Sequence, residues 1–173
     1  MEDARLGRYS LNLAHNYRGM NAQQSLPVRN QVVPSLAGEG EFPWGAQRIR
    51  LEGELAGFFG DHDGVSGTAS GQDRNDLGVF LQLSRSGQDP LTGRLRFERY
   101  GDDYRPAGAV ITPDRQSAEG HLGWRFASGL FFRGRAQTFR DGLESGNPTD
   151  THTFGINLAG PLFPDYVAGF TAN

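Results

Sequence analysis

The alternation of apolar and polar residues along extended runs is the feature that most restricts how this chain can fold. Between residues 47 and 59, Ile49, Leu51 and Leu55 alternate with the charged Arg50 and Glu52. Successive side chains of a β-strand point to opposite faces, so this period of two predicts a strand with one apolar face and one polar face. The 25 Gly interrupt most windows, and no helical spacing is sustained. The chain is therefore predicted to be all-β.

The same alternation recurs along most of the chain. We predict eight strands and a short ninth, at about residues 9–17, 31–42, 47–59, 77–85, 91–100, 121–126, 132–138, 154–158 and 166–173. Several of these runs reach about the 9–11 residues that a tilted strand needs to cross a bilayer. Strands of globular proteins are most often about 5–6 residues long. The strand lengths therefore favour a membrane-spanning sheet.

The connections between the predicted strands alternate in length. Long polar segments at 18–30, 60–76, 101–118 and 141–152 alternate with short ones at 43–46, 86–90, 127–129 and 161–165. An up-and-down meander places alternate connections at opposite ends, and transmembrane barrels have short turns at one end and long loops at the other. A Greek-key sandwich has no reason to keep this alternation. We predict one domain over residues 1–173, an antiparallel up-and-down meander that forms a transmembrane β-barrel or a segment of one.

Two environments fit the apolar face, because a membrane barrel turns this face to lipid and a soluble barrel buries it. Small residues such as Gly53, Gly57 and Ala136 lie on it, where a soluble core would need large side chains for close packing. We therefore expect the apolar face to meet lipid. The residues expected to face lipid are Leu51, Leu55, Leu95, Phe97, Leu122, Trp124, Phe132 and Ile156.

The opposite face carries closely spaced charges, and all 17 basic residues of the chain are Arg. The candidates for facing the barrel lumen are Arg48, Arg50, Glu52, Glu54, Arg94, Arg96, Glu98, Arg125, Arg133 and Arg135. In one interpretation they set ion selectivity and bind anionic solutes. In the other they pair with one another and fill the interior of a narrow barrel.

Composition excludes several classes of protein. A mean hydropathy of −0.54 excludes a bundle of membrane helices, and the absence of Cys excludes disulfide frameworks and thiolate metal sites. A net charge of −3 argues against nucleic acid as a partner. Residues 1–8 lack the apolar stretch of a signal peptide. No catalytic, metal-binding or cofactor-binding motif is present, so we expect neither an enzyme nor a cofactor.

Two groups of loop acids have the residue types of a cation site. They are the segment Asp61–Gly64, which includes His62, and the set Asp102, Asp103, Asp114 and Glu119. The more common role of such residues is that of solvated loop acids, and we favour it. We also expect loops 60–76 and 101–118 to be exposed and mobile, because they offer little apolar area to offset their ordering entropy.

Two segments carry a resemblance to a known class of protein. The stretches Arg-Tyr-Gly-Asp-Asp-Tyr-Arg-Pro-Ala-Gly at 99–108 and Ser-Gly-Asn-Pro-Thr-Asp-Thr at 145–151 are similar to strand-to-loop segments of bacterial outer-membrane β-barrel proteins. The resemblance implies a place in the outer membrane of a Gram-negative bacterium, with lipid as partner. It implies a porin-like channel, a translocation unit for small solutes or an exported polymer, or a membrane anchor. The alternative is a soluble β-barrel or sandwich module that binds a ligand or carbohydrate.

The count of strands raises the question of closure. Single-chain bacterial barrels have even numbers of strands, and the predicted ninth strand at 166–173 makes the number odd. The chain also does not end on a strand with a terminal aromatic residue. We therefore expect a segment of a larger barrel. The alternative is a closed barrel of eight strands, in which the strand at 9–17 pairs with the strand at 154–158.

Overall fold

The structure is a computed structural model that describes residues 7–18, 29–45, 47–61, 73–86, 90–144, 146–163 and 166–172. These residues form one antiparallel sheet of nine strands, so the prediction of an all-β meander is confirmed. The strands are β1 (Arg8–Arg18), β2 (Arg29–Trp44), β3 (Gln47–Asp61), β4 (Asp73–Ser86), β5 (Leu91–Tyr100), β6 (Arg115–Arg125), β7 (Phe131–Asp141), β8 (Thr149–Phe163) and β9 (Tyr166–Ala172). In the described part of the chain, no helix is long and apolar enough to cross a membrane.

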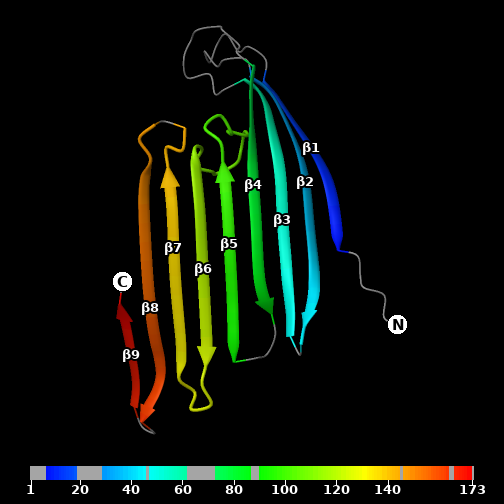
Figure 1. Ribbon diagram of the computed structural model, residues 1–173. Helices are drawn as coiled ribbons and strands as arrows, with labels where there is room; N and C mark the ends of the chain where they lie inside the picture. The colour runs from blue at the N-terminus through cyan, green and yellow to red at the C-terminus, as the bar shows by residue number, and fades with distance from the viewer. Residues whose placement is uncertain are drawn as a thin grey trace, which may run out of the picture.

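Each strand pairs with the next one along the chain, and the order in the sheet is the order in the sequence. The short connections β2–β3, β4–β5, β6–β7 and β8–β9 therefore lie at one end of the sheet and the longer ones at the other (Figure 1). We call these the turn end and the loop end. The arrangement follows from the alternating connection lengths, because each short turn reverses the chain directly into its neighbour.

Several strands extend beyond the apolar alternation that predicted them. Strand β6 begins at Arg115 rather than near His121, and Arg115 stands opposite Asp141 at the end of β7. The side chains of these two residues form an ion pair across the strands. The ladder of backbone hydrogen bonds needs no apolar side chains, so it continues into segments whose polarity suggested loops.

The register places like side chains beside one another. Leu36 on β2 stands opposite Leu11 on β1 and Leu55 on β3, while Glu52 on β3 stands opposite Gln82 on β4. Directly opposed residues of antiparallel strands project from the same face. The alternation seen in single strands thus becomes two continuous surfaces, an apolar face and a polar face.

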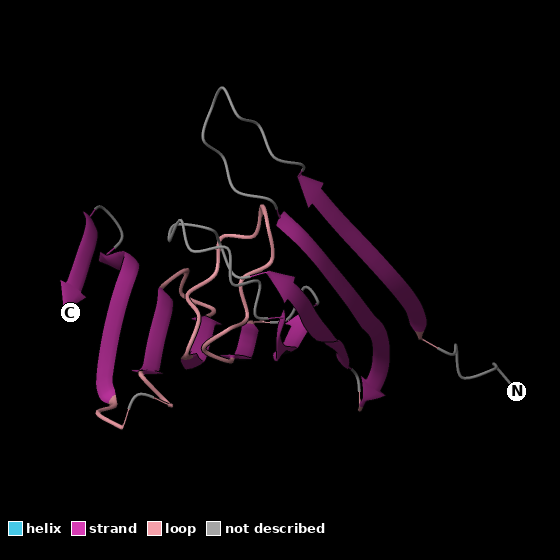
Figure 2. Ribbon diagram, turned by 90° about the horizontal axis from the view of Figure 1, so that it is seen from above, coloured by secondary structure: helices cyan, strands magenta, loops and turns pink. Residues whose placement is uncertain are grey.

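The sheet is bent into a trough, and the polar face is its concave side (Figure 2). Strands β1 and β9 form its two edges. Strand β8 pairs with β7 and β9, whereas β1 pairs with β2. The alternative in which eight strands close through pairing of the first with the eighth is therefore wrong for this structure.

Among the described residues, the buried apolar cluster is small and lies on the concave side. It consists of Ala56 and Phe58 from β3 and Tyr104 from the β5–β6 loop, with Val33 and Tyr100 packed against it. On the convex side, Leu11 is 81%, Leu95 60% and Phe154 67% exposed. No element of the described chain covers these residues, so this apolar surface faces outward.

Candidate functional site

The concave polar face is the surface on which the structure gathers most of the chemistry-bearing side chains. All ten residues predicted as a lumen-facing set lie on it by register: Arg48, Arg50, Glu52, Glu54, Arg94, Arg96, Glu98, Arg125, Arg133 and Arg135. The residues predicted to face lipid lie on the convex face, as their positions opposite Leu, Phe and Gly partners require. The two predicted sets therefore occupy opposite faces of the sheet.

The part of the polar face on β2 and β3 is a network of Glu and Arg. The Arg50 guanidinium lies 2.6 Å from both Glu39 and Glu52. Gln82 on β4 donates a hydrogen bond of 2.6 Å to the Glu52 carboxylate, so the network crosses three strands. Arg48 lies 3.6 Å from Glu41 nearer the turn end. In this region each guanidinium has a carboxylate partner. This is what we expect if the charges pair with one another and fill the interior.

The part on β5–β7 is richer in Arg. Arg96 pairs with Glu98, and its guanidinium also lies over the Phe80 ring, 5.3 Å from the centroid. The Glu119 carboxylate contacts two partners, His121 at 2.7 Å and Arg135 at 2.9 Å. These pairs lie at mid-strand on a half-exposed surface, where each contributes at most about 1 kcal/mol to stability. Their main effect is to fix the positions of the charges.

The loop between β5 and β6 folds into the trough. It bends across the loop end of β5 toward β4 (Figure 1), and Tyr104 inserts among Phe58, Tyr100 and Gly78. The Tyr104 ring meets Phe58 edge-on at 6.4 Å and stacks on Tyr100 at 5.4 Å between centroids. Burial raises the pKa of the Tyr104 phenol to about 12. The loop therefore rests on the concave face through an aromatic anchor.

Polar contacts also hold the first half of this loop against the sheet. The Asp76 carboxylate accepts a hydrogen bond of 2.8 Å from the backbone N–H of Asp103, and Arg74 pairs with the Asp103 carboxylate at 2.5 Å. At the loop end of β2, the backbone N–H of Ala107 donates a hydrogen bond of 3.0 Å to Gln31, which is buried. The expectation that segment 101–118 is exposed holds for its tip at residues 108–110, whereas Tyr104 and these contacts bring the part before the tip against the sheet. Residues 62–72 of the other loop expected to be exposed lie outside the described residues.

The structure does not assemble the candidate cation site of Asp102, Asp103, Asp114 and Glu119 considered from the sequence. Glu119 pairs with His121 in mid-sheet, far along β6 from Asp114, and Asp103 pairs with Arg74. No set of three metal-ligating side chains occurs in the part of the chain that the structure describes. The nearby Asp102 carboxylate raises the pKa of Glu144 at the loop end. Residues 62–64 of the other candidate, and the Asp61 side chain, lie outside the described residues.

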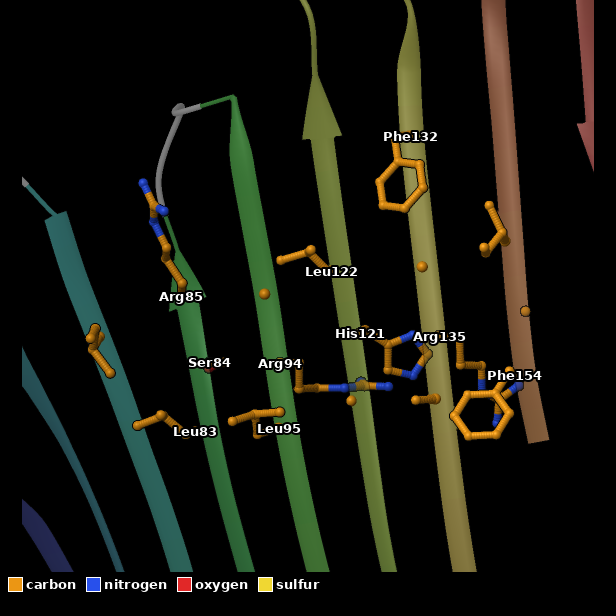
Figure 3. Close-up of a pocket in the computed structure, with 17 residues that line it drawn as sticks. Leu83, Ser84, Arg85, Arg94, Leu95, His121, Leu122, Phe132, Arg135 and Phe154 are labelled. Atoms are coloured by element: carbon orange, nitrogen blue, oxygen red, sulfur yellow. The ribbon is translucent and has the colours of Figure 1, made fainter. Parts of the chain in front are cut away.

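The convex face carries a shallow apolar groove that crosses β3–β8 (Figure 3). Small residues form its floor, among them Gly93, Gly120 and Ala136, and larger side chains such as Leu95 and Phe154 form its walls. Its two adjoining parts have volumes of about 560 and 570 Å³. The groove follows from the pattern of Gly and Ala that argued against a tightly packed soluble core.

In comparisons with known proteins, no family model matches the chain, and neither a curated protein nor a solved structure is significantly similar to it. The function is therefore inferred from the two faces of the sheet and from the loop inside the trough.

Sequence reasoning missed the residues that bring the loop into the trough. Tyr104 lies in a Gly- and Asp-rich segment, and Gly78 interrupts the alternation of β4 where the ring is seated. One signal for the inward position of the loop was Tyr104 itself, an aromatic residue in a polar loop. Its partners Phe58 and Gly78 are remote in sequence, so the contact could not be predicted from neighbouring residues. The polar-face position of Phe58, an aromatic residue out of phase with its strand, was a second signal.

Proposed function

We propose that this chain forms a wall of a β-barrel in the outer membrane of a Gram-negative bacterium and acts as a porin-like channel. The observation that carries the proposal is the two-faced sheet, whose uncovered apolar side is convex and whose charged side is concave. A soluble protein would leave this apolar area in water, at a cost of about 25 cal/mol for each Å². Lipid chains cover such a face without a second protein layer.

The dimensions of the apolar face support this proposal. Ile49 and Phe59 mark its ends on β3, and the ten residue steps between them span about 33 Å at about 3.3 Å each. A strand tilt of about 40° reduces this span to about 25 Å, the height of the apolar band of outer-membrane barrels. At the loop end the convex face becomes charged, where Arg140 and Asp150 lie 3.4 Å apart. Headgroups would meet these charges.

Two features favour a channel over a membrane anchor or a translocation unit for a polymer. The concave face is charged along its length, and the β5–β6 loop narrows the space beside it. A loop held in this position would restrict the lumen to small solutes. The edges β1 and β9 would need further strands to pair with, because unmet backbone groups are costly in lipid.

Trp124 provides a direct test, since it lies on the convex face and is one of two tryptophans. We would replace Trp44 with Phe and reconstitute the protein in vesicles of brominated phospholipid. Quenching of Trp124 fluorescence by the brominated chains, with little quenching by aqueous acrylamide, is expected. The matched control places a tryptophan on the polar face, as Gln82→Trp in a chain with both native tryptophans changed to Phe, and should show the reverse.

The opposite results would overturn the proposal. A protein that purifies without detergent, and whose Trp124 is insensitive to brominated lipid, would instead be the soluble module that binds a ligand or carbohydrate. A membrane-inserted barrel should also migrate differently on a gel before and after heating, because the folded barrel resists the detergent until it is heated.

A further inference from the structure

The charges of the polar face divide unevenly between its two parts. Among the side chains that the structure describes, those of β2 and β3 on this face include four Glu and two Arg, namely Glu39, Glu41, Glu52, Glu54, Arg48 and Arg50. On β5–β7 it carries six Arg and three acids, namely Arg94, Arg96, Arg115, Arg125, Arg133, Arg135, Glu98, Glu119 and Asp141. The β5–β7 part therefore has three more positive than negative charges, and His121 lies among them.

Each of the three acids on β5–β7 is engaged by an Arg. Glu98 pairs with Arg96, Glu119 with Arg135, and Asp141 with Arg115. Within the described residues, Arg94, Arg125 and Arg133 have no carboxylate within ion-pair distance, and all three are exposed. Internal pairing thus accounts for the Arg of β3 but leaves a surplus on β5–β7.

Two of these three Arg residues, Arg94 and Arg133, lie in or beside one row of basic residues across the sheet. Arg94, His121 and Arg135 occupy one row across β5, β6 and β7, with about 5 Å between neighbouring Cα atoms. The Arg94 side chain extends across β6 toward the His121 ring (Figure 3). Arg133 lies two residues from Arg135 on the same face of β7, about 7 Å along the strand. The patch is therefore of the size of one multiply charged small solute.

Aromatic contact fixes one member of the patch. The Arg133 guanidinium lies over the Phe131 ring, 5.4 Å from its centroid. Stacking of this kind holds the planar group in one orientation and leaves its N–H donors free at the edge. A donor that is already oriented loses less entropy when it binds an oxyanion. The Glu119 carboxylate of the adjoining strand already contacts His121 and Arg135.

We propose that Arg94, Arg133 and the adjoining Arg135 form a binding site for small anionic solutes on the polar face. The site recognises phosphate or carboxylate oxyanions, because the guanidinium fork matches both groups with two parallel hydrogen bonds. This inference deepens the proposed function, on which its role in transport rests: it assigns anions as the solutes that the β5–β7 wall favours. Binding itself depends on the patch and not on where the protein resides.

Isothermal titration of the full chain in detergent micelles, at low ionic strength, tests the site with two probes. Inorganic tripolyphosphate supplies phosphate oxyanions and citrate supplies carboxylates. The probe that binds with the higher affinity shows which of the two groups the site prefers. Arg94→Gln and Arg133→Gln should each weaken binding about tenfold, as expected for loss of a charge-assisted hydrogen bond. Arg94→Lys retains the charge but not the fork, and should recover only part of the affinity.

Arg99→Gln is the matched control, because Arg99 is an exposed residue of the same strand on the convex face. It removes the same charge and should change the affinity by less than about twofold. Absence of binding by both probes would overturn the inference, as would an equal loss in Arg99→Gln, which would indicate a general charge effect. If brominated lipid does not quench Trp124 but the probes still bind, the proposed place in a membrane is wrong and the anion-binding site is retained.

Discussion

The ring of Tyr104 occupies the space that a side chain at Gly78 would fill. A Cβ atom built at position 78 would lie 2.7 Å from Cζ of Tyr104 and within 3.0 Å of two further ring atoms. Gly78 is buried on the concave face of β4 and stands opposite Tyr100. The inward position of the β5–β6 loop therefore depends on the absence of a side chain in a neighbouring strand.

Gly78→Ala should displace Tyr104 and release the loop from the trough. A methyl group at this distance forces the ring away, at a cost of about 1–3 kcal/mol for overpacking. Limited proteolysis of the folded protein should then cut within 105–110 many times faster than in the parent chain. The matched control is Gly93→Ala on β5, where the nearest atom lies 3.7 Å from the new Cβ and ordinary contact suffices. Equal cleavage of the two variants would contradict this account of the loop.

Alkaline pH should release the same loop. Burial raises the pKa of Tyr104 to about 12, whereas an unfolded tyrosine ionises near 10. The folded state therefore favours the neutral phenol, and its contribution to loop docking is complete below about pH 10 and is lost as the pH rises through about 12. Absorbance at about 295 nm, compared between the parent and Tyr104→Phe, should reveal one late-titrating tyrosine. A difference spectrum centred at the ordinary pKa would show that Tyr104 is not buried.

An arginine on the convex face should destabilise the protein in a bilayer. Phe154 lies in mid-sheet beside the groove, and a cation near the bilayer midplane costs about 2–4 kcal/mol. Phe154→Arg should lower the free energy of unfolding from vesicles by about that amount, as measured by urea titration. Thr153→Arg is the control, because Thr153 is the adjacent exposed residue of β8 and points to the polar face. A larger loss in Thr153→Arg would reverse the assignment of the faces.

Engineered cysteine pairs should report the open arrangement of the strands. The chain has no native Cys, so each pair can be introduced without interference. Leu11 and Leu36 are directly opposed across β1 and β2, and cysteines there should form a disulfide under mild oxidation. Cysteines at Leu11 and Ile156 should not join within one chain, because Ile156 is opposed by Gly134 and Ala172. Efficient intramolecular joining of this second pair would mean that eight strands close into a barrel.

The strands, their two faces and the alternation of short and long connections follow from the amino-acid sequence alone. Alternation at residues such as Leu51 and Glu52 is a local property, since adjacent side chains of any strand point to opposite sides. Short turns then made neighbouring strands pair, and the register followed from matching like faces. The polar-face placement of Arg94, Arg96 and Arg133 was predicted on the same grounds.

Tertiary structure decided how far the sheet closes, which of its charges pair and where the β5–β6 loop goes. Curvature and the separation of β1 from β8 arise from twist accumulated over nine strands, which no single segment encodes. Pairing of Glu119 with Arg135 rather than Arg94 depends on which of two neighbouring strands supplies the side chain that reaches the carboxylate. The inward loop depends on Tyr104 meeting Phe58 and Gly78, which are distant in sequence and become neighbours when β3 and β4 have paired.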